Sequence, residues 1–197
     1  DFIKTGIYDR NRKFITTISP SMDILISSNL ERLLYMLCGE DDAQIKKWFG
    51  ELAQSGRYEV SDDVKAKLKA DFSAGFCTDD ETEETIKNIF DKYSYTCDTH
   101  TAVAVKVYEE YRKSTGDATK TLIASTASPY KFSASVLKAI EGKAPEIDEY
   151  EMVDRLYKLS GFDVPKELLE LKNKEERFKT SIDKSEMKEF VLKALGI

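Results

Sequence analysis

The stretch from Lys120 to Phe132 constrains the fold of this chain most strongly. A short apolar run over residues 122–124 ends in the hydroxyl side chains of Ser125 and Thr126. An apolar run of this length, without polar alternation, is typical of a strand buried on both faces of a sheet. Ser128 is a favoured N-cap residue, and the proline after it is preset for the first position of a helix. The stretch therefore predicts a strand, a tight turn and a helix.

The hydroxyl groups at the end of this strand have two interpretations. In open α/β sheets, ligands bind at the carboxyl ends of the strands, which favours Thr126 and Ser128 as ligand-binding groups. A plain strand-to-helix connection explains Ser128 equally well, because capping alone accounts for it. Thr126 is harder to explain in this way, since a hydroxyl that closes a buried strand needs a hydrogen-bond partner.

Composition is that of an ordinary globular protein that is rich in charge. Of 197 residues, 41% are hydrophobic and 34% are charged, and the formal net charge is −6. This balance argues against nucleic acid as a partner, because phosphate binding needs a basic face. No run is long enough to cross a membrane and no signal-peptide pattern is present, so we expect a cytoplasmic protein without membrane contact. The three cysteines are expected to be reduced, and one histidine without a CxxC pair does not predict a zinc site.

Most of the chain has the periodicity of amphipathic helices. A polar cap residue followed by Glu three positions later predicts helix starts at Ser28, Thr78, Asp148 and Asp183. We expect helices over residues 28–38, 45–56, 61–72, 78–93, 101–114, 129–142, 148–157 and 183–195, with a short one from 165.

The set of candidate strands is incomplete. Only residues 14–18 and 95–97 offer partners for the strand at 121–125, and a sheet of one or two parallel strands is not stable. The chain also begins at Asp1 without a methionine. We therefore expect most of the sheet to lie upstream of the first residue, or the helices to carry the core.

The sequence contains no complete catalytic motif. Its nine glycines form neither GxGxxG nor a P-loop, and GxSxG and HExxH are absent. His100, the only histidine, follows Asp98 at a predicted helix start. We interpret His100 as a polar residue in a first helical turn.

Three segments resemble motifs of the threonine synthases. The first is ISPSMDILISSNLERLL at 18–34, preceded by FIKTGIY at 2–8. The second is CDTHTAVA at 97–104, and the third is ASTASPYKF at 124–132. Their order matches the carboxyl-terminal part of that family's chain. The resemblance departs at two positions, where Ser128 replaces a histidine and Thr99 replaces a proline.

The resemblance implies a helix-rich α/β fold. The chain would contribute part of the parallel sheet of a tryptophan synthase β-like enzyme (fold type II). Most of that sheet would lie upstream of the first residue. Residues 1–144 would then form the carboxyl-terminal part of the catalytic domain that binds pyridoxal phosphate, and residues 145–197 would form a helical carboxyl-terminal extension.

The resemblance also implies a function for the intact protein. Threonine synthases are lyases of threonine biosynthesis that use pyridoxal 5'-phosphate to convert O-phospho-L-homoserine and water to L-threonine and phosphate. The family's Schiff-base lysine and its Ser-Gly-Asn-Phe-Gly loop lie upstream of the matching motifs, and Lys131 matches a different lysine. We therefore expect a fragment that is inactive by itself. Its open strand edge at 121–125 suggests self-association.

The resemblance assigns site residues on two sides of the active site. Thr126 matches a threonine that bonds the pyridine nitrogen of the cofactor. Ser19, Asn29 and Arg32 lie in the segment that matches the substrate side, where Arg32 could clamp a phosphate group in a bidentate manner. The alternative for Arg32 is an exposed helix residue that pairs with an acidic neighbour, Glu31 or Asp23.

Two other classes of function remain open. One is a different lyase of the same fold type, such as a serine or threonine dehydratase or a diamino-acid lyase, although the segment from Ser19 to Arg32 argues against it. The other is a non-enzymatic helical interaction module. Such a module would need an exposed apolar face on one of the amphipathic helices.

Overall fold

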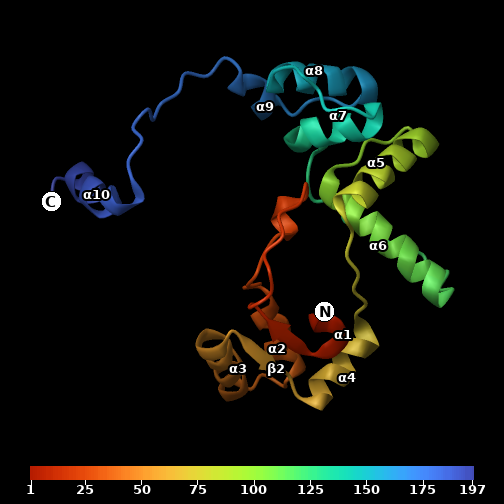
Figure 1. The fold of residues 1–197 in the computed structure, drawn as a ribbon, viewed down its shortest axis with the longest axis vertical. Coiled ribbons are helices and arrows are strands. Elements are labelled where there is room, and N and C mark those ends of the chain that lie inside the picture. Colours follow the sequence, from red (N-terminus) through yellow and green to blue (C-terminus); the bar gives the residue numbers. More distant parts are fainter. The chain divides into compact units, whose positions relative to one another are not determined.

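The computed structural model describes all residues from 1 to 197, and the chain forms two compact units. The larger unit spans Asp1–Phe162 and the smaller unit spans Asp163–Ile197. Helices predominate in both units, which confirms the helix-rich part of the expected fold (Figure 1). The larger unit continues through α8 (Glu149–Ser160), past the boundary that the sequence suggested after residue 144.

The amino-terminal part of the larger unit is built around aromatic side chains. Its elements are α1 (Phe2–Thr5), β1 (Ile7–Asp9), α2 (Leu30–Leu37), α3 (Asp42–Ser55), β2 (Arg57–Glu59) and α4 (Asp62–Asp71). The two strands pair in antiparallel fashion, with Tyr8 opposite Tyr58. Buried apolar side chains from four of these elements close the core: Leu34, Trp48, Leu52, Tyr58, Val64 and Leu68.

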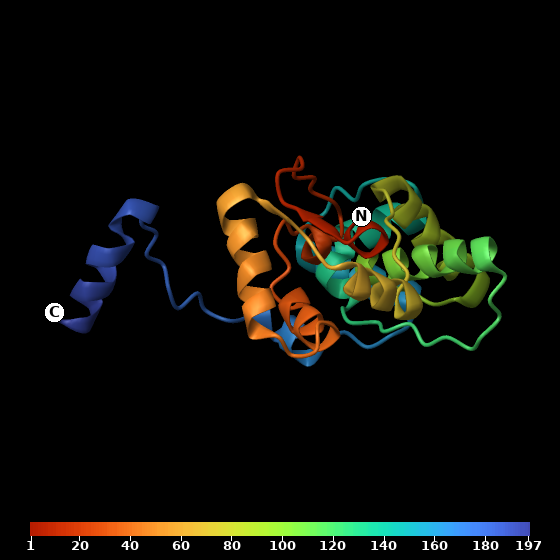
Figure 2. The same cartoon turned by 90° about the horizontal axis from the view of Figure 1, so that it is seen from below.

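The rest of the larger unit is a helical layer. It consists of the 3-10 turn η2 (Pro129–Phe132) and the helices α5 (Asp79–Tyr93), α6 (Thr99–Thr115), α7 (Ser133–Glu141) and α8. Helix α5 packs against both α6 and α7, and α7 packs against α8 (Figures 1 and 2). The buried faces meet at Ile86, Val136, Leu137 and Leu156.

Local capping chemistry explains where most helices begin. Thr78 accepts a hydrogen bond from the Glu81 amide, and the Glu81 side chain returns to the Thr78 amide, so the predicted capping box is confirmed. The capping box predicted at Ser28 is wrong. Helix α2 begins at Leu30 after Asn29, whose side-chain oxygen instead accepts from the Ser27 hydroxyl at 2.6 Å.

The predicted strand at 121–125 is wrong for this structure. Residues 117–127 form no strand or helix, and Leu122 is 99% exposed (Figure 2). Neither 14–18 nor 95–97 forms a strand, so the only strand pair is β1–β2 and the expected parallel sheet is not formed. A strand needs hydrogen-bonded neighbours along its edges, and the chain places none beside this segment. The turn and helix that follow are confirmed as η2 and α7.

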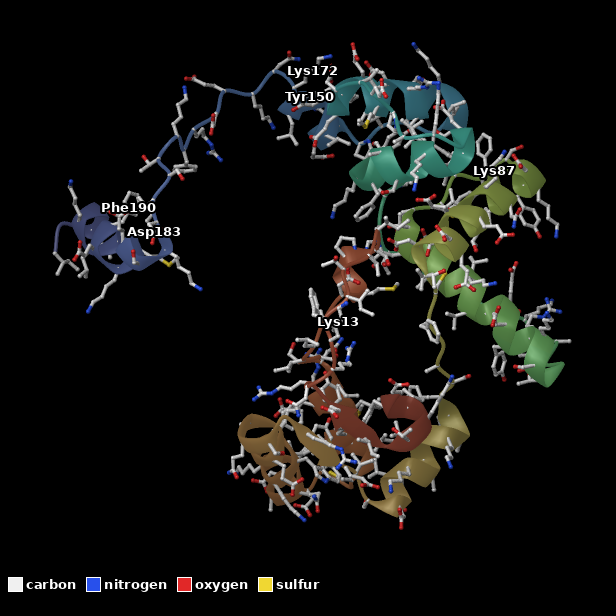
Figure 3. The ribbon with its side chains drawn as sticks, in the orientation of Figure 1. Lys13, Lys87, Tyr150, Lys172, Asp183 and Phe190 are labelled. Atoms are coloured by element: carbon white, nitrogen blue, oxygen red, sulfur yellow. The ribbon has the colours of Figure 1, made fainter.

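The smaller unit consists of short helices: α9 (Lys166–Leu171), the 3-10 turn η3 (Lys184–Glu186) and α10 (Met187–Leu195). The predicted cap is confirmed, since Asp183 and Glu186 form a capping box before α10. Figure 3 shows Asp183 at the start of this helical segment and Phe190 along it. No helix in the chain is both long enough and apolar enough to span a bilayer.

Candidate functional site

The start of α6 is organised by the carboxylate of Asp98. Asp98 is the N-cap residue, and its Oδ1 accepts hydrogen bonds from the amides of His100 (2.8 Å) and Thr101 (3.3 Å). The side chain is fully buried. A charge in this position is stabilised by the helix amides and by the positive end of the helix dipole.

His100 lies between Asp98 and a turn near the beginning of the chain. Its Nδ1 is 3.2 Å from Asp98 Oδ1 and 3.4 Å from Thr99 Oγ1, while its Nε2 accepts from the Ser21 amide at 3.3 Å. An amide can only donate, so these partners assign the proton to Nδ1, toward Asp98. The sequence placed His100 correctly in the first helical turn, but it did not indicate burial or this contact with a residue 79 positions away.

The turn that contains Ser19 is fixed at both sides. The 3-10 turn η1 (Pro20–Met22) follows Ser19, and the Asp23 carboxylate accepts from the amide and the hydroxyl of Thr17 (2.6 and 2.8 Å). The Ile18 amide donates to Asp79 at the start of α5 (3.1 Å). Ser19 itself is buried, and its hydroxyl lies 3.1 Å from the Thr17 hydroxyl.

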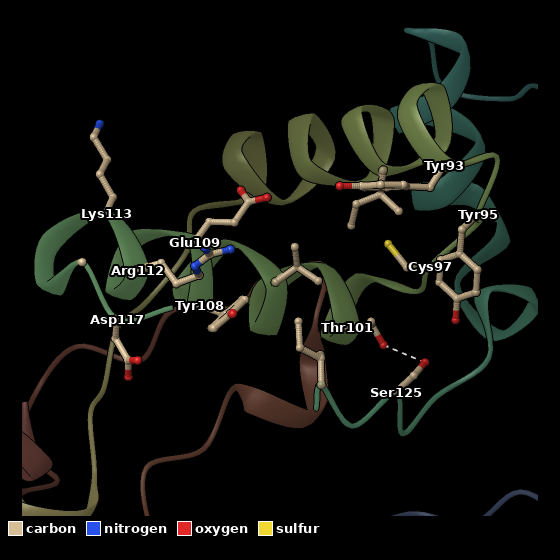
Figure 4. A pocket seen from close by; sticks show the side chains of 14 residues that line it. Tyr93, Tyr95, Cys97, Thr101, Tyr108, Glu109, Arg112, Lys113, Asp117 and Ser125 are labelled. Carbon is tan, nitrogen blue, oxygen red and sulfur yellow. Dashed lines mark hydrogen bonds between the residues drawn. The ribbon is translucent and has the colours of Figure 1, made fainter. Parts of the chain in front are cut away.

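The segment that contains Thr126 is joined to the same helix start. Thr101 Oγ1 donates to Asp98 Oδ2 and lies 3.0 Å from Ser125 Oγ (Figure 4). The single Thr101 proton is therefore shared between the Asp98 carboxylate and the Ser125 hydroxyl oxygen. The next residue, Thr126, is exposed, and its hydroxyl makes no hydrogen bond within the chain.

An open hollow lies beside this cluster, between α5, α6 and the segment 117–125. Its volume is about 760 Å³, and aromatic and aliphatic side chains line much of it: Ile89, Tyr93, Tyr95, Val105, Tyr108 and Ile123. Glu109, Arg112 and Lys113 line its other end (Figure 4). Burial raises the pKa of the Cys97 thiol in this hollow to about 12, with the Asp98 charge adding to the shift. Cys97 is therefore a protonated thiol at neutral pH rather than a nucleophile.

The residues expected on the substrate side do not all come together. Ser19 joins the cluster at the start of α6, whereas Asn29 and Arg32 lie at the start of α2 and make no hydrogen bond or ion pair with that cluster. Arg32 is exposed beside a smaller hollow of about 440 Å³ between α2 and α3. It forms no ion pair with Glu31 or Asp23, so the paired alternative is not found.

Comparison with known proteins points to one family. The family model described as threonine synthase, C-terminal, matches residues 101–191. Threonine synthase of Saccharomyces cerevisiae is 38% identical over 155 residues, which cover 72% of this chain and 30% of the yeast protein. The chain matches the carboxyl-terminal part of the threonine synthases. The human relative called threonine synthase-like 1 is 36% identical over 163 residues, covering 82% of this chain and 21% of that protein.

Solved threonine synthases share the fold of this chain. The yeast structure matches with a TM-score of 0.76 at 30% identity, and the match covers 99% of this chain and 39% of the yeast chain. A threonine synthase from Brucella melitensis, solved with pyridoxal phosphate bound, matches with a TM-score of 0.64 at 35% identity over 78% of this chain and 32% of its own. The chain thus spans about a third of the length of the solved threonine synthases that it matches.

Proposed function

We propose that this chain supplies the carboxyl-terminal part of a threonine synthase and donates the contact to the pyridine nitrogen of its cofactor. Pyridoxal phosphate, when bound, supplies the electron-withdrawing ring that the reaction needs. The observation that carries the proposal is the Thr126 hydroxyl, which is exposed and has no partner within the chain. Its neighbour Ser125 is tied to the start of α6 through Thr101.

The chemistry of the surrounding groups fits a neutral contact to the ring nitrogen. Asp98 is the carboxylate joined to this cluster, but it is fully buried and its oxygens already accept from His100 and Thr101. A hydroxyl at Thr126 leaves the ring nitrogen largely unprotonated, whereas a carboxylate would hold it protonated. Other groups of the intact enzyme must then stabilise the negative charge that develops on the substrate.

The proposed substrate is O-phospho-L-homoserine, which loses phosphate from its γ-carbon and takes up water at its β-carbon. Arg32 is the candidate for binding the phosphate group, because its guanidinium is exposed and has no carboxylate partner. Asn29 lies beside it at the start of α2, and Ser19 would act through the shape of its turn, since its own hydroxyl is engaged by Thr17.

We propose further that the 197 residues are inactive without the rest of the protein. The family's Schiff-base lysine has no counterpart among the motifs that match here, and Lys131 is an exposed residue of the turn η2. Activity would then require the residues that correspond to the remaining two thirds of the solved enzymes.

A chimera tests the proposal. The matching carboxyl-terminal part of the yeast enzyme is replaced by this chain, and threonine and phosphate are measured with O-phosphohomoserine as substrate. Cofactor loading is followed by absorbance, so that folding and chemistry are separated. We expect a loaded chimera that forms threonine. A loaded chimera that forms none would contradict the proposal.

A second candidate is another lyase of the same fold type. It stays a candidate because Ser128 and Thr99 stand where the threonine synthase pattern has a histidine and a proline. Assays of the protein that carries this chain with O-phosphohomoserine and with L-threonine separate the two candidates. Deamination of L-threonine without use of the phosphorylated substrate would favour the second.

A further inference from the structure

We propose that Asp98 is a positioning residue that holds the substrate-side turn and the cofactor-side segment of the proposed site in register. The inference rests on the proposed function, because that function gives the two segments their roles. The geometry that carries it is a branched hydrogen-bond network with a fully buried carboxylate at its centre.

The first branch runs from Asp98 through His100 to the turn after Ser19. Asp98 Oδ1 lies 3.2 Å from His100 Nδ1 and fixes the proton on that nitrogen, which leaves Nε2 free to accept from the Ser21 amide at 3.3 Å. The ring is buried and lies 4.8 Å from the Phe132 ring. A change of tautomer would place two N–H donors face to face, so the carboxylate controls whether the turn is held.

The second branch runs from Asp98 through Thr101 to the cofactor-side segment. Thr101 Oγ1 is the donor toward Asp98 Oδ2 and toward Ser125 Oγ at 3.0 Å, so one hydroxyl joins the buried carboxylate to this segment. Ser125 directly precedes Thr126, the residue proposed to face the pyridine nitrogen. The same carboxylate is therefore joined by hydrogen bonds to both sides, through His100 and through Thr101.

Helix capping by itself does not account for this arrangement. Asp148 caps α8 with the same pattern of two amides, Tyr150 at 2.9 Å and Glu151 at 3.0 Å, and its side chain makes no hydrogen bond to another side chain. Asp98 adds contacts to an imidazole and to a hydroxyl, and it is fully buried. Asp148 is thus a natural control for the capping role alone.

The test compares Asp98→Ser with Asp148→Ser in the 197-residue chain. Serine is as good an N-cap as aspartate, so both helices keep their caps, but its hydroxyl donates as well as accepts and no longer fixes the proton on His100 Nδ1. His100 is the only histidine, so its ring nitrogens give one set of NMR signals that report the tautomer. We expect Asp98→Ser to lose the fixed Nδ1–H form and to speed hydrogen exchange of the Ser21 amide by about tenfold or more. Asp148→Ser should change neither.

A second variant keeps the test decisive if Asp98→Ser does not fold. Thr101→Val is close in shape and severs only the second branch. We expect lower backbone NMR order parameters at 125 and 126, with the His100 tautomer unchanged. Unchanged order parameters at these positions, or an unchanged tautomer in folded Asp98→Ser, would overturn the proposal. These readouts need neither cofactor nor turnover, so an inactive chimera would count against the proposed function and leave the positioning role intact.

Discussion

Tyr8 and Tyr58 stack face to face across the two strands, with ring centroids 5.3 Å apart and ring planes 2° from parallel. Tyr58 is buried, whereas the Tyr8 hydroxyl reaches out of the stack. It donates to the Leu25 carbonyl at 3.0 Å and accepts from the Ser27 amide at 2.7 Å. The aromatic core therefore also fixes the segment that leads to Asn29 and Arg32.

The burial of Tyr58 predicts a loss of stability at high pH. Burial raises the pKa of Tyr58 above its usual value of 10.0, and Tyr8 adds to the shift. The unfolded chain releases this proton near pH 10, so the stabilisation is complete below that pH and is lost as pH rises toward the folded pKa. Above pH 10 the unfolding free energy should fall faster in wild type than in Tyr58→Phe, by up to about 1.4 kcal/mol per pH unit. Equal slopes in denaturant titrations would contradict this, and Tyr157→Phe is the exposed control.

Removing the Thr126 hydroxyl should lower activity without unfolding the protein. Thr126→Val in the chimera keeps the shape, and the side chain is exposed, so stability should be unchanged. We expect the turnover number to fall by at least about tenfold, the equivalent of one lost hydrogen bond of ~1.4 kcal/mol. Thr121→Val, in the same irregular segment, is the control. Equal activities of the two variants would exclude Thr126 from the site.

Arg32→Ala should weaken substrate binding and leave the cofactor in place. The loss of a charge-assisted contact costs about 1.5–3 kcal/mol, so the KM for O-phosphohomoserine should rise by about tenfold or more. Cofactor absorbance should stay the same, because Arg32 makes no contact with the cluster at α6. Arg57→Ala removes another exposed arginine of the same part of the chain and serves as the control. A KM that does not change would make Arg32 an ordinary surface charge.

The isolated chain should form no covalent bond to pyridoxal phosphate. After incubation with the cofactor, reduction with borohydride and proteolysis, mass spectrometry should find no lysine labelled in a one-to-one ratio. Scattered, weak labelling of exposed lysines is the background. Stoichiometric labelling of one residue, Lys131 for example, would show that the chain carries its own reactive lysine.

The unpaired segment 117–127 predicts self-association of the chain. Leu122 is 99% exposed beside the apolar hollow, and an unpaired backbone can accept a strand from a second copy. Sedimentation velocity should show association that grows with concentration. Leu122→Asp should weaken it, whereas Lys120→Asp, outside the apolar run, should weaken it less. A monomer at all concentrations that also binds no hydrophobic dye would refute the expectation.

The sequence predicted what depends on near neighbours along the chain. Thr78, Asp148 and Asp183 cap helices as expected, because a cap involves only the next three residues. The strand at 121–125 could not be predicted in this way, since strand formation depends on a partner elsewhere. Leu122 lies in an apolar run that is typical of a buried strand, yet its side chain is 99% exposed because the segment has no partner strand.

The same distinction applies to the candidate site, where features set by neighbouring residues were predicted and features set by distant contacts were not. The turn after Thr126 was evident from the local pattern, because a cap residue, Ser128, and a proline follow one another. The cofactor role of Thr126 stays a prediction. Asp98 and His100 lie two positions apart in the sequence, but their burial and the contact of His100 with Ser21 depend on packing between distant segments. An N-cap aspartate two residues before the only histidine was the one sequence signal that could have indicated this pair.

The contact between Ser21 and His100 joins residues that are 79 positions apart. A ribosome adds about 5–20 residues per second, so His100 leaves it about 4–16 s after Ser21. Throughout that interval the turn at residues 19–22 has no imidazole to hold it. The core residues around Tyr58 end at Leu68, 32 positions before His100. Synthesis from the amino terminus therefore supplies the whole aromatic core before it supplies the imidazole that holds this turn.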